Sequence, residues 1–166
     1  MANWLNSDGL YVKFGQSEGT AGAVGEYIRD DNIHYVELTI ADMTTITATA
    51  GTILDYTYVI PKNARIEKVT IVNRTAATSG GSAVLNIGLI RTDQTTELDY
   101  DGFVAAAALA TFNAAGETVE YTPGSTGAGA LIGTTLAFNG LLCADYDTAA
   151  FTAGKIVVRV YYSIPT

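Results

Sequence analysis

Apolar and polar residues alternate along most of the chain after about residue 33, a period typical of strands with one buried face. The runs at residues 36–40 and 84–89 follow this period. The clearest run lies near the C-terminal end, where one face carries Ile156, Val158, Val160, Tyr162 and Ile164. Pro165 cannot donate a hydrogen bond to a strand ladder, so we expect this strand to end there.

Turn signals separate further strands. The segment Pro61-Lys62-Asn63-Ala64 predicts a turn between two strands of residues 53–73, because proline fixes φ and asparagine tolerates turn geometry. The apolar parity shifts between Ile66 and Val69, which predicts a bulge near Glu67–Lys68. Further turns are expected at 80–81 and 93–95, a strand at 117–121 and a loop at 123–129.

One stretch favours a helix. Residues 103–112 are rich in alanine, Asp101 is a reasonable N-cap, and Gly116 is placed to end a helix. A short helix near residues 102–114 is therefore left open. The many short β-rich runs, at spacings of about 8–12 residues, indicate an all-β fold, an antiparallel β-sandwich with jelly-roll-like connections.

The first 26 residues differ from the rest of the chain. A short apolar run spaced by glycines is followed by a Gly/Ser/Thr/Ala-rich segment, which cannot offset its own ordering entropy by burial. We therefore predict an extended N-terminal arm at residues 1–26 and a single β-sandwich domain at residues 27–166. The candidate contacts of the arm to a partner are Trp4, Leu10, Tyr11 and Phe14. The alternative is that Leu10, Val12 and Phe14 form a first strand of the sandwich.

Composition favours contacts with other proteins. Only 16% of the residues are charged, so much of the surface must be uncharged. The net charge of −8 argues against nucleic-acid binding, which depends on clustered lysines and arginines. No apolar run approaches the ~18 residues of a membrane span, and the start lacks the pattern of a signal peptide. We expect no membrane association, synthesis in a reducing cytoplasm, and a buried side chain for the single cysteine, Cys143.

The search for catalytic and ligand sites is mostly negative. His34 is the only histidine, so the common nucleophilic triads and a zinc site are not expected. Acidic residues at 93–101 and at Asp145 and Asp147 leave a hydrolase or a calcium site open. The segment Gly124–Gly129 lacks the Gly-Lys-Ser/Thr ending of a phosphate loop. We predict no enzyme activity, and no catalytic, metal or cofactor-binding residue.

Several pieces, spread over nearly the whole chain, resemble the small β-sandwich decoration, or cement, proteins of tailed-bacteriophage heads. The pieces are Asn3-Trp4, Asp8-Gly9-Leu10, Lys13-Phe14-Gly15, the run Val59 to Ile66, Asn86 to Leu89, Asp101 to Val104, and Phe151 to Val158.

This resemblance implies a structural virion protein without catalysis, which binds the outside of an assembled capsid and stabilises it. It implies the major capsid protein and further copies of this chain as partners, with a homotrimer favoured, and a place on the capsid surface after synthesis in the host cytoplasm. The alternative is a carbohydrate- or receptor-binding sandwich of a head fibre or tail. Exposed aromatic residues would form its site, and the candidates are Tyr56, Tyr58, Tyr100, Tyr146 and Tyr161.

Overall fold

The chain divides into two units, residues 1–32 and residues 33–166. A computed structural model describes residues 3–5, 11–13, 33–54, 56–57 and 59–164. In the first unit, β1 (Asn3–Leu5) and β2 (Tyr11–Lys13) pair antiparallel and form a two-stranded sheet of their own. The predicted boundary of the arm at residue 26 falls outside the described residues and stays a prediction.

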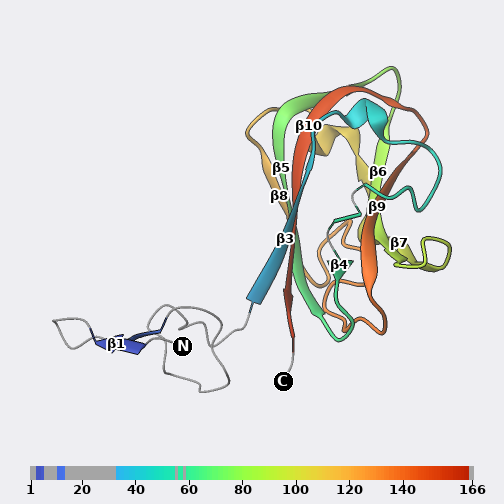
Figure 1. The fold of residues 1–166 in the computed structure, drawn as a ribbon. Coiled ribbons are helices and arrows are strands. Elements are labelled where there is room, and N and C mark those ends of the chain that lie inside the picture. Colours follow the sequence, from blue (N-terminus) through green and yellow to red (C-terminus); the bar gives the residue numbers. More distant parts are fainter. Residues whose placement is uncertain (1–2, 6–10, 14–32, 55, 58, 165–166) are drawn as a thin grey trace. The chain divides into compact units, whose positions relative to one another are not determined.

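The second unit consists of two four-stranded antiparallel sheets (Figure 1). One sheet has the order β3–β10–β5–β8, with β3 at Ile33–Ile40, β10 at Phe151–Ser163, β5 at Arg65–Ser79 and β8 at Thr118–Tyr121. The other has the order β4–β9–β6–β7, with β4 at Val59–Ile60, β9 at Gly140–Asp147, β6 at Val84–Arg91 and β7 at Glu97–Ala108.

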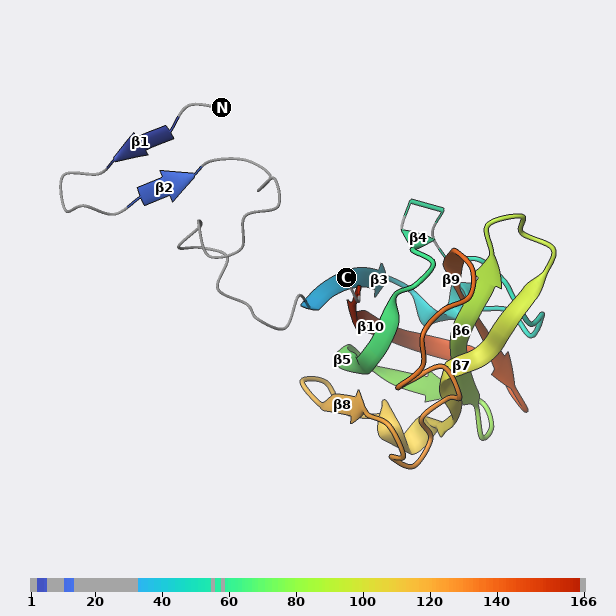
Figure 2. The same cartoon turned by 90° about the horizontal axis from the view of Figure 1, so that it is seen from below.

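The connections are those of a jelly roll. Except at the β6–β7 hairpin, each strand of the second unit is followed by a strand of the opposite sheet. The two sheets therefore face each other as the layers seen in Figure 2. The predicted all-β sandwich with jelly-roll-like connections is confirmed.

The inner faces of the two sheets carry the residues that the alternation singled out. Val36, Leu38 and Ile40 of β3 are buried, as are Ile156, Val158 and Val160 of β10. From the other sheet Leu85, Ile87 and Leu89 enter the same cluster. Each such side chain contributes roughly 1.5–3 kcal/mol on burial, which makes this interface the main source of stability.

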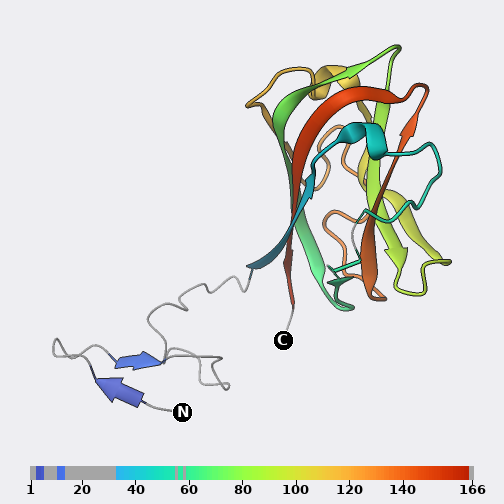
Figure 3. The ribbon, with the colours of Figure 1, turned by 45° about the horizontal axis from the view of Figure 1, so that its top comes forward.

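The two ends of the sandwich differ. At one end a single-turn 3₁₀ helix, η2 (Met43–Thr45), lies against β10 and buries Met43 completely (Figure 3). At the other end Ser163 of β10 is paired with both Ile33 and Arg65. The first and last strands of the second unit thus reach the same end.

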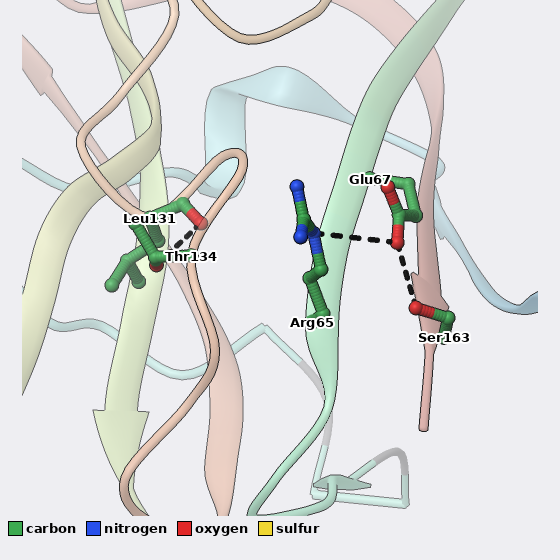
Figure 4. Close-up of polar contacts among 5 residues, drawn as sticks. All are labelled: Arg65, Glu67, Leu131, Thr134 and Ser163. Carbon is green, nitrogen blue, oxygen red and sulfur yellow. Dashed lines mark hydrogen bonds and ion pairs between the residues drawn. The ribbon is translucent and has the colours of Figure 1, made fainter. Parts of the chain in front are cut away.

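The predicted bulge in β5 is confirmed. Tyr161 is opposite Lys68 and Tyr162 is opposite Ile66, which leaves Glu67 as the extra residue. The Glu67 carboxylate accepts a hydrogen bond from the Ser163 hydroxyl at 2.7 Å and lies 3.7 Å from Nε of Arg65 (Figure 4). The same close-up shows the Thr134 hydroxyl donating to the carbonyl of Leu131, which closes a turn in the loop before β9.

The short helix that the sequence left open near residues 102–114 does not form. Residues up to Ala108 belong to β7, and only a 3₁₀ turn, η3 (Leu109–Thr111), follows. Val104 and Ala107 are paired with Ile87 and Leu85 of β6 and are buried. Pairing with β6 and burial in the core outweigh the helix propensity of alanine, which is worth less than 1 kcal/mol per residue.

Candidate interaction surfaces

Two of the four predicted contact residues of the arm lie within the described residues. Trp4 is in β1 opposite Val12, and Tyr11 is in β2 opposite Leu5. Leu10 and Phe14 lie outside the described residues. β1 and β2 pair with each other and belong to neither four-stranded sheet. The role of the four residues as contacts stays a prediction.

The outer face of the β3–β10–β5–β8 sheet carries a row of aromatic and charged side chains. Tyr161 is opposite both Tyr35 and Lys68 in the register of the sheet. The rings of Tyr35 and Tyr161 are 5.7 Å apart, and the Lys68 ammonium lies 5.1 Å from the centre of the Tyr161 ring. The same ammonium contacts the Glu120 carboxylate of β8 at 2.6 Å. The row therefore crosses all four strands.

A second ion pair lies next to this row. Nε of Arg159 donates to the Glu37 carboxylate at 2.6 Å, between β10 and β3. The charges of this face are thus paired within the chain, whereas Tyr35 is 61% exposed and offers a large apolar area. Sequence reasoning missed Tyr35, because its proximity to Tyr161 depends on strand pairing between distant parts of the chain.

The tyrosines predicted for a carbohydrate site are not gathered in one place. Tyr56 is strongly exposed, whereas Tyr146 is half-buried and meets Phe151 edge-on. Tyr100 packs against a small cluster on the β4–β9–β6–β7 sheet that contains Ile90 and Cys143. Tyr161 belongs to the outer row of the opposite sheet, and Tyr58 lies outside the described residues.

The two groups of acidic residues, at 93–101 and at 145–147, each contain a carboxylate that is partly or fully buried in the fold, Asp99 and Asp145 respectively. Partial burial and the neighbouring Asp101 raise the pKa of Asp99 from 3.8 to about 6. Burial raises the pKa of Asp145 as well, although the amide of Asn86 donates to its carboxylate and opposes the shift. Within the described ranges, no cluster of three or more His, Cys, Asp or Glu side chains is placed to hold a metal ion.

The two remaining candidate residues, Cys143 and His34, pack within the sandwich. Cys143 is buried as predicted, and burial followed by the charge of Asp145 raises the pKa of its thiol to about 12. The thiol therefore stays protonated at neutral pH and is a poor nucleophile. His34 stacks on Tyr162 with ring centres 5.6 Å apart. No helix in the described part of the chain is long and apolar enough to cross a membrane.

These features define an all-β jelly-roll sandwich with an aromatic and ion-paired outer face. Its fold is similar to that of a chain in the "Capsid of Ralstonia phage GP4", with a TM-score of 0.51, 17% sequence identity, and coverage of 93% of this chain and 92% of that chain. A second similar chain comes from the "Acidic stable capsid structure of Helicobacter pylori bacteriophage KHP30", with a TM-score of 0.47, 16% identity, and coverage of 81% and 94%. No family model and no curated protein matches the chain.

Proposed function

We propose that the protein is a structural component of a phage virion that binds the outside of an assembled capsid and stabilises it, without catalysis. The observation that carries the proposal is the shared jelly-roll fold with a chain of a phage capsid structure, along nearly the full length of both chains. The sequence resemblance to capsid decoration proteins supports the same role independently. The partners are then the major capsid protein and further copies of this chain, with a trimer favoured, and the place of action is the capsid surface.

The surface of the second unit suits this role. Its outer face presents Tyr35 and Tyr161 beside charges that are already paired within the chain. A partner can cover such a face without having to neutralise isolated ions, whose burial is costly. The arm adds contact area, and several arms in one oligomer can bind the shell together, which offsets the entropy of ordering each arm.

The proposal is tested with shells assembled from the major capsid protein of the same virus. The purified chain is mixed with these shells and sedimented, and bound copies are counted and located by electron microscopy. We expect saturable binding at fixed positions, with a count that matches the local threefold axes for a trimer, and a higher disassembly temperature of the shell. A chain that stays in the supernatant at micromolar concentration and leaves the shell's disassembly temperature unchanged contradicts the proposal.

A second candidate function, carbohydrate binding, is favoured by one observation. The rings of Tyr35 and Tyr161, tilted by 36° against each other, form an aromatic patch on the outer sheet face, and the exposed Tyr35 ring suits stacking on a sugar. A glycan array separates the two candidates. Binding to defined glycans that is lost in Tyr35→Ala, together with no sedimentation with shells, would favour the carbohydrate role.

A further inference from the structure

An open cavity of about 310 Å³ lies where three separate segments of the second unit meet. The segments are the turn after β4, the β6–β7 turn and the residues just before β9, and the lining residues are Lys62, Arg91, Thr92, Asp93, Phe138 and Asn139. Hydrogen bonds donated by backbone amides hold these segments in place. The amide of Lys62 donates to Oδ1 of Asn139 at 2.7 Å, and the amide of Arg91 donates to the carbonyl of Thr96 at 2.9 Å.

The two cations of the cavity have no ion pair, unlike three other cations in the described part of the chain. Arg65, Lys68 and Arg159 are in ion pairs with glutamates, whereas neither Lys62 nor Arg91 has an ion pair among the described residues. Two positive charges thus face one cavity without a matching carboxylate bound to them, on a chain whose net charge is −8.

The one acid of the lining, Asp93, is already occupied. Its Oδ1 accepts from the amides of Thr95 and Thr96, and its Oδ2 accepts from the Thr96 hydroxyl at 2.6 Å. These bonds, that of the Thr96 hydroxyl above all, lower the pKa of Asp93 to about 2, so the carboxylate serves the β6–β7 turn as an anion. Asp93 therefore shapes the turn that presents Arg91 and does not consume the donors of Arg91.

Arg91 is positioned like an anion-binding arginine. Its guanidinium carbon lies 3.5 Å from the centre of the Phe138 ring, so one face of the group is held against an aromatic surface. Its Nε is buried and has no hydrogen-bond partner among the described residues. An incoming carboxylate therefore meets Arg91 end-on at the fork of its two terminal nitrogens, which can donate two parallel hydrogen bonds to it.

Exposed apolar side chains occur in the cavity lining and on β4, the strand that leads into its first segment. Four large apolar side chains of the described residues are strongly exposed, and Phe138 and Val59 are two of them, at 43% and 42%. β4, which contains Val59, pairs with the start of β9, and Phe138 directly precedes that start. Aromatic residues and arginine are the residue types that dominate binding energy at protein interfaces.

The cavity lies at the end of the sandwich at which β3 begins. Ser163 is paired with both Ile33, the first residue of β3, and Arg65, the first residue of β5. Lys62 belongs to the turn that leads into Arg65, so this turn and the first residue of β3 share one end of the second unit; the strand ends can be followed in Figure 1.

We propose that the surface formed by Lys62, Arg91, Phe138 and Val59 docks a carboxylate-bearing segment of the shell protein. The carboxylate binds the fork of Arg91 and the Lys62 ammonium, and apolar residues beside it pack on Phe138 and Val59. This inference rests on the proposed function and names the part of the chain that contacts the shell. The occupant is an isolated carboxylate next to apolar residues, because the net negative charge of the chain opposes the approach of extended polyanions.

The test measures sedimentation of the full-length chain with shells for five variants. We expect Arg91→Gln to weaken binding about tenfold, Phe138→Ala by a similar factor, and Lys62→Gln by about threefold, as for interface residues of these types. Arg74→Gln is the matched control, since Arg74 is an exposed arginine of β5 outside the cavity, and it should bind within about twofold of the unchanged chain. Arg91→Lys keeps the charge without the fork and should recover only part of the loss.

The outcomes separate the inference from the function. If the unchanged chain does not bind shells, the proposed function fails. If it binds and Arg91→Gln, Lys62→Gln and Phe138→Ala bind equally well, the function stands and the docking surface is wrong. A carbodiimide, which joins lysine ammonium groups to adjacent carboxylates, identifies the occupant. A cross-link from Lys62 to the shell protein supports the inference, whereas a cross-link to another copy of this chain or to its own N-terminal segment overturns it.

Discussion

Asn86 and Asp145 form a buried side-chain hydrogen bond across β6 and β9, with Nδ2 of Asn86 donating to Oδ1 of Asp145 at 2.7 Å. The same Nδ2 donates to Asp147 at 2.8 Å, and Oδ1 of Asn86 accepts from the amide of Ala106 at 2.9 Å. Ala106 has a φ of +54°, a conformation that alanine rarely adopts. The side-chain amide of Asn86 therefore connects two carboxylates with a strained, irregular point of β7.

Replacing Asn86 should be costly. Asn86→Ala leaves the buried Asp145 carboxylate and the Ala106 amide without this partner, and we expect a loss of about 2–3 kcal/mol in the free energy of unfolding, measured with urea. Thr152→Ala is the matched control, because it removes an exposed hydrogen bond between the hydroxyls of Thr152 and Thr78. That variant should change stability by less than about 0.5 kcal/mol. Equal losses in both variants would show that Asn86 has no special role.

Asp99 should make stability depend on pH. The pKa of Asp99 is about 6 in the folded chain against 3.8 ordinarily, so the folded state binds more protons than the unfolded state between these values. Stability should therefore fall as pH rises from about 4 to about 6. Because Asp99 is only partly buried, we expect an effect on the order of 1 kcal/mol. Asp99→Asn should remove this part of the pH profile and stabilise the chain at pH 7, as urea unfolding from pH 4 to pH 7.5 can test.

Gly88 is a glycine at which a side chain should do severe harm. A Cβ at this position would lie 2.1 Å from the carbonyl oxygen of Asp99 and 2.4 Å from the carbonyl carbon of Tyr100, both of which are backbone atoms of the adjacent β7. Gly88→Ala should force β6 and β7 apart and cost more than about 3 kcal/mol or prevent folding. Gly80→Ala is the control, because a Cβ there meets nothing within 4 Å, and thermal melts should separate the two variants clearly.

The arm prediction can be tested without disturbing the sandwich. Trp4→Ala and Tyr11→Ala should each weaken sedimentation with shells by about threefold to tenfold, as expected for aromatic contact residues. The melting temperature of the second unit should stay unchanged, because both residues belong to the first unit. Binding as tight as that of the unchanged chain in the double variant would contradict the arm hypothesis. A lower melting temperature would instead favour a packing role for these residues.

The strands of this fold could be predicted from the sequence because burial on one face leaves a direct trace in the order of residues. The faces of β3 and β10 follow the alternation, and the interruption at Glu67 is visible as a shift of parity. β7 left no such trace. Its alanines are acceptable in a helix. Only the pairing with β6, which connects distant residues such as Leu85 and Ala107, makes this segment a strand.

The candidate surfaces were less predictable for the same reason. Tyr35 and Tyr161 become neighbours only through the pairing of β3 with β10. Lys62, Arg91 and Phe138 come from three segments that the jelly roll brings to one cavity. In the sequence Lys62 belongs to an ordinary turn. No residue near Lys62 indicates that Arg91 will stack on Phe138 beside it. Surfaces composed of distant residues require the topology before their members can be recognised.

The start of β3 and the end of β10 lie at the same end of the sandwich, which leaves the opposite end free of both. The connection between β5 and β6, around Gly80 and Gly81, lies at the opposite end of the sandwich from Ile33 and Ser163. Gly80 has open space around it, and chain insertions are tolerated best at such exposed turns. A foreign peptide inserted there would point away from whatever holds the other end. Under the proposed function, the jelly roll is therefore suited as a carrier that presents added sequences on the exterior of a particle.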